Sequence, residues 1–519
     1  MSTLTPAIDL SHHINQATQL RVPSPLKAIF KHMKTPGMIS LASGLPHPST
    51  FPFESLHVKV CAPDAKGIPG EKYTSTSSTT ISVPKYPCVE NEQNTLSIAL
   101  QYSDATGSAR LTSFMYDFTK RVMKPGYSDW QVLLHSGSTD GWSKVVSLMC
   151  EKDEYILVEE HTFSSAQAFW APICKAAPVA IDHEGLIPED LEDVLEHWDE
   201  KHPGSKRPHL LYTVPVGQNP TGATMGLERK KQIYDICVKH DVIICEDEPY
   251  YFLQFPRYVL PFQRCLPQPA RYISEEEFVG SLVPTFLSLD YQGRVIRLET
   301  FSKTLGPGNR LGYFVCNPVF AERLLRATEV TTQTASGWSQ AIVEQLIVSH
   351  WGHEGFLRWL MGLGDVYTTR RDWMCDLLSE TFDLVSTGNS DELLAISKDS
   401  GKDGQKTPFF TFSPPRSGMF VYIKLHLEHT SSFKALKTEG EEDAENMWAQ
   451  MFWESLIEEK VLLVPGDYYA PYIGRGQRVK PKPGVAFFRL AFCYESKEEM
   501  KLGIQRMGRV FAKYWDSEL

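Results

Sequence analysis

The chain has 519 residues, too many for one ordinary hydrophobic core, so two or more packed units are expected. Its composition, 42% hydrophobic and 22% charged, is globular, and its net charge of −11 argues against nucleic-acid binding. The N-terminus lacks a secretory pattern, and no apolar run approaches the ~20 residues that cross a bilayer, so no membrane association is expected. Ten cysteines without a CxxC pair indicate no metal site and favour reduced thiols in the cytoplasm.

Three regions are predicted along the chain. Residues 1–60 form an N-terminal arm and part of a small domain, residues 61–345 a large domain, and residues 346–519 a small C-terminal domain. Four stretches without regular apolar spacing are predicted to be surface loops, at 61–95, 255–289, 387–406 and 472–484.

Short apolar runs alternate with helical patterns in the middle of the chain. The runs are QVLLHSG, YILVEE, HLLYTVP, VIICED and VIRLET, and the helical patterns include GWSKVVSLMCEK and LERKKQIYDICVKH. This alternation predicts an α/β unit with a mostly parallel sheet. From about His350, long helical patterns precede strands near GMFVYIKL and AFFRLAF, which predicts a smaller α+β domain.

Chemically distinctive residues follow five of these runs. They are Ser138 and Thr139 at a helix start, then Phe163, Asn219, Asp247 with Tyr250, and finally Thr300, Ser302 and Lys303. Ligands of open parallel sheets bind beyond the carboxyl ends of the strands, so these residues are expected to meet. Together they supply a phosphate loop, a ring, an amide, a carboxylate, a phenol and an amine, which suits a phosphorylated pyridine aldehyde.

Lys303 is the candidate nucleophile, because a partly buried amine forms an imine with an aldehyde. A lone lysine is usually a solvated surface cation, but this one follows an apolar strand and stands between two hydroxyl residues. Arg310, seven residues later, is a candidate phosphate clamp. Asp247 is either the N-cap of a helix or the partner of a protonated ring nitrogen.

The remaining candidates bind the ring or the substrate. Asn219 and Tyr250 are expected to donate hydrogen bonds to a phenolate oxygen, although GQNPTG is also typical of a plain turn. Phe163 is either a core aromatic residue or a ring-stacking one. Arg489 interrupts the apolar strand AFFRLAF, where a bidentate contact with a substrate carboxylate would explain a buried cation.

These motifs resemble the class I/II aminotransferases of fold type I, which use pyridoxal 5′-phosphate (PLP). More narrowly, the chain resembles the fungal aromatic and the kynurenine/2-aminoadipate aminotransferases. The resemblance is carried by RVPSPLKAI, LASGLPHPSTFPF, ALQYSDATGSARL, GSTDGW, VGQNPTG, CEDEPYYFLQF, ETFSKTLGPGNRLGY and FFRLAF. It implies a large domain whose mostly parallel seven-stranded sheet lies between helices, and a smaller α+β domain.

The resemblance also implies a role for each candidate. Lys303 would carry the cofactor and move the substrate proton, Asp247 would pair with the pyridinium, and Arg489 would bind the α-carboxylate together with Asn219. The phosphate would be held by Ser138, Thr139, Thr300, Ser302, Arg310 and, from the other subunit of a homodimer, Tyr102. Gly44 and Arg21 of the N-terminal arm would line the substrate pocket. Phe163 and Thr139 replace the tyrosine and glutamine that are familiar at these positions.

The activity implied is transamination between an aromatic L-amino acid (Phe, Tyr or Trp) and 2-oxoglutarate. A 2-aminoadipate or kynurenine aminotransferase is an alternative within the family. A lyase or decarboxylase on the same fold, a transcription regulator with a ligand domain of this fold, and a non-catalytic scaffold are further alternatives. The acidic charge argues against the regulator, and the complete set of site residues argues against the scaffold.

Overall fold

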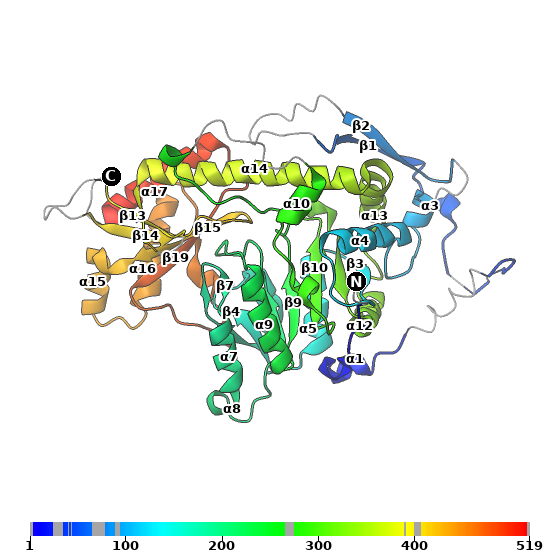
Figure 1. The fold of residues 1–519 in the computed structure, drawn as a ribbon, viewed down its shortest axis with the longest axis horizontal. Coiled ribbons are helices and arrows are strands. Elements are labelled where there is room, and N and C mark those ends of the chain that lie inside the picture. Colours follow the sequence, from blue (N-terminus) through cyan, green and yellow to red (C-terminus); the bar gives the residue numbers. More distant parts are fainter. Residues whose placement is uncertain are drawn as a thin grey trace.

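A computed structural model describes residues 4–23, 35–39, 41–42, 44–64, 78–88, 94–264, 274–388, 391–398 and 406–515. Its two parts, a large α/β domain and a smaller α+β domain, are bridged by the long helix α14 (Gly352–Thr381), which crosses the top of Figure 1. Within the described ranges, no helix is both long and apolar enough to cross a membrane.

A seven-stranded sheet forms the centre of the large domain, with the strand order β3-β11-β10-β9-β8-β4-β5. Only β11 runs antiparallel to its neighbours, while the remaining pairs β10–β9, β9–β8, β8–β4 and β4–β5 are parallel. The strands are β3 (Gln131–His135), β4 (Tyr155–Glu159), β5 (Lys175–Val179), β8 (Leu210–Thr213), β9 (Ile243–Asp247), β10 (Val295–Thr300) and β11 (Gly312–Cys316). All five predicted strands of this region are therefore confirmed.

Helices cover both faces of this sheet, as Figure 1 shows. Its central strands are buried along their whole length, which explains their continuous apolar runs. The helices of this domain are α3 (Leu96–Ala99), α4 (Ala109–Val122), α5 (Ser138–Met149), α6 (Ser164–Trp170), α7 (Pro188–Glu196), α8 (Trp198–Lys201), α9 (Leu227–Lys239), α10 (Glu275–Ser281), α11 (Phe286–Leu289), α12 (Pro318–Val330) and α13 (Gly337–Val343). Two short strands, β6 (Ile181–Asp182) and β7 (Gly185–Leu186), form a separate hairpin.

The smaller domain is a six-stranded sheet, β12-β13-β14-β15-β19-β16, packed against helices. Its strands are β12 (Asp383–Ser386), β13 (Leu393–Ile396), β14 (Pro408–Phe412), β15 (Phe420–His426), β16 (Val464–Pro465) and β19 (Val485–Ala491), and its helices are α15 (Ser431–Thr438), α16 (Ala444–Glu458) and α17 (Lys497–Tyr514). The predicted domain boundary after residue 345 falls inside a π-helical segment (Glu344–Trp351) that leads directly into α14.

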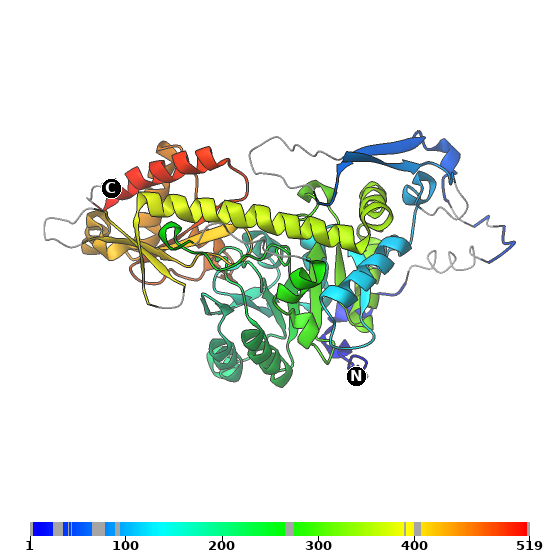
Figure 2. The ribbon, with the colours of Figure 1, turned by 45° about the horizontal axis from the view of Figure 1, so that its top comes forward.

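The four predicted loops contain more regular structure than their composition suggests. Strand β2 (Ser78–Pro84) pairs antiparallel with β1 (Ser55–Cys61) in a hairpin at the edge of the molecule (Figure 2), so the loop prediction was wrong there. The alternation of Thr79, Ile81 and Val83 toward the protein is the missed strand signal. Helices α10 and α11 interrupt 255–289, β13 interrupts 387–406, and a hairpin of β17 (Tyr472–Gly474) and β18 (Gln477–Arg478) occupies 472–484. Residues 65–77, 89–93, 265–273, 389–390 and 399–405 lie outside the described ranges.

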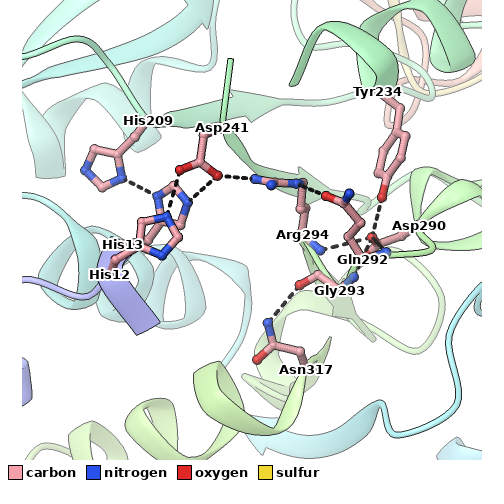
Figure 3. Close-up of polar contacts among 10 residues, drawn as sticks. All are labelled: His12, His13, His209, Tyr234, Asp241, Asp290, Gln292, Gly293, Arg294 and Asn317. Atoms are coloured by element: carbon pink, nitrogen blue, oxygen red, sulfur yellow. Dashed lines mark hydrogen bonds and ion pairs between the residues drawn. The ribbon is translucent and has the colours of Figure 1, made fainter. Parts of the chain in front are cut away.

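The first part of the N-terminal arm, which includes α1 (Gln16–Gln19), is anchored to the large domain near the amino ends of the strands. Leu10 and Ile14 are buried in its core. Beside them, His13 hydrogen-bonds Asp241 through Nε2 (3.2 Å) and His209 through Nδ1 (3.0 Å), and Arg294 donates to Asp241 (2.7 Å; Figure 3). This polar cluster ties the arm to the turn that precedes β9.

Candidate active site

The carboxyl ends of the parallel strands bring most of the predicted site residues to one edge of the sheet. Ser138 and Thr139 begin α5 just after β3, and Phe163 precedes α6 after β4. Asn219 follows β8, Asp247 ends β9, Thr300 ends β10, and Ser302 and Lys303 lie in the turn beyond it. Strand order alone therefore assembles residues that are up to 165 positions apart, from Ser138 to Lys303.

Asp247 is the buried carboxylate of this edge and is only 5% exposed. Its Oδ2 accepts a hydrogen bond from the hydroxyl of Tyr212 in the adjacent strand β8 (2.8 Å). Its Oδ1 is buried without a hydrogen-bond partner among the described residues. Burial raises the pKa of Asp247 to about 6, although the Tyr212 hydrogen bond and the nearby Ser138 hydroxyl act in the opposite direction. A buried carboxylate with one open oxygen is suited to pair with a cation.

An anion-binding cradle lies around the start of α5. The Arg310 guanidinium donates to the carbonyl oxygens of Ser136 (3.3 Å) and Pro307 (3.0 Å). A Cβ on Gly137 would lie 2.4 Å from Arg310 Nη2, and Gly137 has φ +95°, so only glycine fits at this position. The hydroxyl of Ser138 is buried without a partner among the described residues. An unpaired hydroxyl, an exposed guanidinium and a helix N-terminus together suit a phosphate.

The hydroxyls of Thr300 and Ser302 complete this cradle from the other side. Thr300 Oγ1 donates to Ser302 Oγ (2.9 Å) and accepts from the Ser302 amide (3.1 Å). Ser302 Oγ lies 3.5 Å from Arg310 Nη1, so the turn after β10 and the guanidinium face each other. Thr139 is exposed at the first turn of α5.

Lys303 is half-buried in the turn directly after this hydroxyl pair. Within the described part of the chain, no hydrogen bond or ion pair holds its ammonium group. An amine without an acidic partner is available to react, whereas a paired one is restrained.

Asn219 and Arg489 join the two domains across the site. Arg489 Nη1, on β19 of the smaller domain, donates to Asn219 Oδ1 (2.7 Å). Close backbone approach makes this contact possible, because a Cβ on Gly217 (φ +64°) would lie 2.6 Å from Gly418 Cα. The Arg489 guanidinium lies 4.1 Å above the Phe420 ring, and its Nε is buried without a partner among the described residues. The cation is thus held by an amide and a ring, not by a carboxylate, and can receive one.

Tyr250 and Phe163 supply aromatic rings beside these groups. Tyr250 is 5% exposed and packs edge-on against Phe420 (5.9 Å between ring centres). Burial raises the pKa of Tyr250, so its hydroxyl keeps its proton and remains a donor. Phe163 is partly buried at the N-cap of α6, and the neighbouring Thr162 amide donates to the backbone carbonyl oxygen of Tyr469 in the smaller domain (2.9 Å).

Three predicted residues lie apart from this set in the single chain. Tyr102 is 60% exposed, and Gly44 is exposed with no heavy atom within 4 Å of the place a Cβ would take. The carbonyl of Arg21 accepts from Arg323 (3.0 Å), which fixes the arm on α12. Among the described residues no contact links these three to the cradle, so their roles remain predictions.

Comparison with known proteins agrees with this geometry. Residues 87–507 match the family model described as aminotransferase class I and II. The chain belongs to this family. An aromatic amino acid aminotransferase of Schizosaccharomyces pombe is 35% identical over 512 residues, which cover 97% of each chain. An L-tyrosine:2-oxoglutarate aminotransferase of Serpula lacrymans is 34% identical, over 89% of this chain and 84% of the relative. The crystal structure of aminotransferase Aro8 from Candida albicans superposes with a TM-score of 0.85 at 34% identity, covering 99% of this chain and 100% of that one.

Membership of the aminotransferase family confirms three predictions at once. The chain is an enzyme of the predicted class, its fold is that of class I and II aminotransferases, and its cofactor is PLP. The residues present fit that cofactor. The open Oδ1 of Asp247 suits a protonated ring nitrogen, and the cradle of Arg310 and Ser138 suits a phosphate.

One residue of this aminotransferase site is not predicted from the sequence. Tyr212 is simply one member of the strand run HLLYTVP there. It pairs in register with Cys245, so it points to the same face of the sheet as Asp247, two residues further along β9. The alternation of side chains along two neighbouring strands is the signal that could have found it.

Proposed function

We propose that this aminotransferase transfers the amino group of an aromatic L-amino acid to 2-oxoglutarate, giving the aromatic 2-oxo acid and glutamate. The proposal rests on one observation: Asp247 and Arg489 lie at the same edge of the sheet. Asp247 has one open oxygen, and Arg489 has no carboxylate partner among the described residues. The names of the two relatives, an aromatic and an L-tyrosine:2-oxoglutarate aminotransferase, support this choice of substrates.

Each residue has a role that its contacts suit. When bound, PLP supplies an electron sink for the charge that develops at the substrate α-carbon. Asp247 Oδ1 keeps the ring nitrogen protonated, and Asn219 and Tyr250 donate to the phenolate oxygen. Lys303 would hold the cofactor through its Nζ, and the same amine, when free, would move the α-proton of the substrate. Arg489 binds the substrate α-carboxylate.

The remaining site residues hold the phosphate or line the pocket. Ser138, Thr139, Thr300, Ser302 and Arg310 bind the phosphate, and Phe163 stacks on the ring. Rings of Phe420 and Tyr469 lie 4.1 and 5.2 Å from the Arg489 guanidinium, an environment that suits an aromatic donor. A 2-aminoadipate or kynurenine aminotransferase is the alternative that the same residues permit.

We further propose that the enzyme is a homodimer with shared active sites. In a single chain Tyr102 and Gly44 are exposed, as are the apolar side chains of Leu20, Ile39 and Leu41. A second subunit that covers this region would bury apolar surface and bring Tyr102 to the phosphate and the arm, with Arg21, to the substrate. A cytoplasmic location, with no membrane or nucleic-acid partner, is proposed from the net charge of −11 and from six buried cysteines that form no disulfide among the described residues.

A substrate screen tests the proposal. Holoenzyme is mixed with single amino acids, and the visible absorbance of its bound PLP and the oxo acid released are measured. Phenylalanine, tyrosine and tryptophan should change the absorbance and release their 2-oxo acids, and 2-oxoglutarate should then restore it. Faster conversion of 2-aminoadipate or kynurenine would support the alternative, and no conversion of any amino acid would exclude transamination.

Replacement of Lys303 tests the role on which every other role depends. Lys303→Ala should lower turnover by roughly 10³-fold or more, because both the attachment point and the proton carrier are lost. The matched control is Lys239→Ala on α9, whose ammonium lies at the surface between Glu192 and Glu196. Turnover of Lys303→Ala at the rate of the control would refute the assignment.

A further inference from the structure

A hydrogen bond from Tyr212 accounts for the asymmetry of the Asp247 carboxylate. The two side chains lie on neighbouring parallel strands and on the same face of the sheet. Tyr212 OH lies 2.8 Å from Asp247 Oδ2, and Tyr212 is fully buried. Burial raises the pKa of Tyr212 well above its usual value, so the phenol keeps its proton and acts as the donor.

The position of the Tyr212 ring is fixed by packing from the helical layer. Its ring lies 4.5 Å from that of Trp142 on α5, and Trp142 is itself held because its Nε1 donates to the carbonyl oxygen of Ala166 (3.1 Å). A fully buried ring between a strand and a helix has few alternative rotamers. The phenol therefore meets Asp247 in one defined direction.

We propose that Tyr212 is a positioning residue of this aminotransferase: it holds Oδ2 of Asp247 so that Oδ1 alone is presented to the protonated ring nitrogen of the cofactor. This inference rests on the proposed function of Asp247. A hydrogen bond donated to the charged form of a carboxylate stabilises that form, which opposes the effect of burial. Tyr212 thus keeps Asp247 ionised and aimed without touching cofactor or substrate.

The chain contains a second tyrosine–aspartate pair that serves as a matched control. Tyr234 OH donates to Asp290 Oδ1 at the same distance of 2.8 Å, as Figure 3 shows. Asp290 accepts four further hydrogen bonds, from the amides of Gln292, Gly293, Arg294 and Val295. Loss of the Tyr234 hydroxyl therefore leaves Asp290 with four hydrogen bonds. The pair lies near the amino ends of the strands, away from the proposed site residues.

The experiment compares Tyr212→Phe with Tyr234→Phe as holoenzymes. PLP retained during dialysis gives the dissociation constant, and the pH dependence of kcat/KM gives the ionisation of the free enzyme. In Tyr212→Phe the PLP dissociation constant should rise by roughly 10- to 100-fold, the range expected for a hydrogen bond to a charged group. The acid limb of its pH profile should move up by roughly one unit. Tyr234→Phe should match the wild type in both measurements.

A double mutant separates a direct role from a structural one. In an Asp247→Asn background the Tyr212→Phe change should have little further effect on PLP retention, because the charge that the phenol stabilises is gone. Additive losses in the double mutant would overturn the proposal, as would a Tyr212→Phe enzyme with the retention and pH profile of the wild type. If the wild type itself binds no PLP, the proposed function fails first, which is a different result.

Discussion

Two buried aspartates lie at opposite ends of the same sheet, and the one proposed to bind the cofactor differs from the other in its hydrogen bonds. Asp290, drawn in Figure 3, precedes β10 near the amino ends of the strands and is fully buried. It accepts five hydrogen bonds, one of them from Val295, which the figure does not draw. Asp247 ends β9 at the carboxyl end, is 5% exposed, and accepts one from Tyr212. Burial is nearly equal, so burial alone does not identify the site.

The two ends of the sheet differ in how many hydrogen bonds the buried carboxylate accepts. A buried carboxylate that lacks donors costs stability, and it persists only where something else requires it. Two arginines follow the same division. Arg294 donates to Asp241 (2.7 Å), whereas Arg489 donates only to the neutral amide of Asn219 (2.7 Å) among the described residues. A carboxylate with an open oxygen and a cation without a carboxylate partner among the described residues thus both lie at the end where a cofactor and a substrate are proposed to bind.

The largest expected effect comes from exchanging the two carboxylates for amides. Asp247→Asn should lower kcat/KM by roughly 10²- to 10³-fold, the size of a lost electrostatic contact in an active site. Its thermal stability should hold or increase, because a costly buried charge is removed. Asp290→Asn should instead lower the free energy of unfolding by about 2–4 kcal/mol, since an amide group cannot accept five hydrogen bonds.

Steady-state kinetics and chemical denaturation of both variants measure these effects. Folded Asp290→Asn enzyme should have the same kcat/KM as the wild type. A variant Asp247→Asn that loses stability and keeps its activity would reverse the assignment of the two ends.

A smaller effect is expected for the two arginines. Arg489→Lys should raise KM by roughly 10- to 100-fold, because an ammonium cannot bind a carboxylate in a bidentate manner. The KM of Arg294→Lys should stay unchanged, because Arg294 is paired with Asp241 at the other end of the sheet. Measuring KM and kcat separately for both amino acid and oxo acid distinguishes them. An equal rise of KM in the two variants would mean that the loss is structural.

The sequence predicts well where these candidates lie, because its signal is local. Each candidate follows an apolar strand run, and parallel strands bring their carboxyl ends together, so the amino-acid pattern alone places Asp247, Asn219 and Lys303 at one edge. Tyr212 could not be assigned in this way, because its partner depends on the register of β8 against β9. The roles of Tyr102 and Gly44 remain predictions, because no contact among the described residues links either of them to the other candidates.

The amino end of the sheet, where Asp290 lies, could hardly be predicted from the sequence. Asp290 directly follows a stretch predicted to be an irregular loop, and four of its five donors are backbone amides, which no side-chain pattern reveals. The hairpin of β1 and β2 was missed for a related reason, because a serine- and threonine-rich strand resembles a loop in composition. Local chemistry identifies functional groups, whereas these contacts depend on pairing between distant segments.

The last expected effect, which is absent at neutral pH, is a pH dependence of stability at the amino end of the sheet. Burial lowers the pKa of His13 to about 4, against the attraction of Asp241, while the neighbouring imidazoles of His209 and His12 act in the same direction as burial. Arg294, bound to the same carboxylate, adds a further fixed positive charge to the cluster (Figure 3). The ordinary pKa of histidine is about 6.5, so below that pH the unfolded chain binds a proton that the folded chain does not. The contribution of neutral His13 to the free energy of unfolding is therefore fully present above pH 6.5. It decreases by up to about 3 kcal/mol as the pH falls toward 4.

Replacement of His13 by glutamine should remove this acid-dependent loss. His13→Gln retains a polar side chain but cannot be protonated, so its melting temperature should fall less steeply than that of the wild type between pH 6.5 and 4. Its PLP retention and kcat/KM at neutral pH should match the wild type, because the cluster lies at the amino ends of the strands and the cofactor residues at the carboxyl ends. Parallel melting curves of the two proteins would show that His13 does not titrate with folding, and a loss of PLP would show that the two ends of the sheet are not independent.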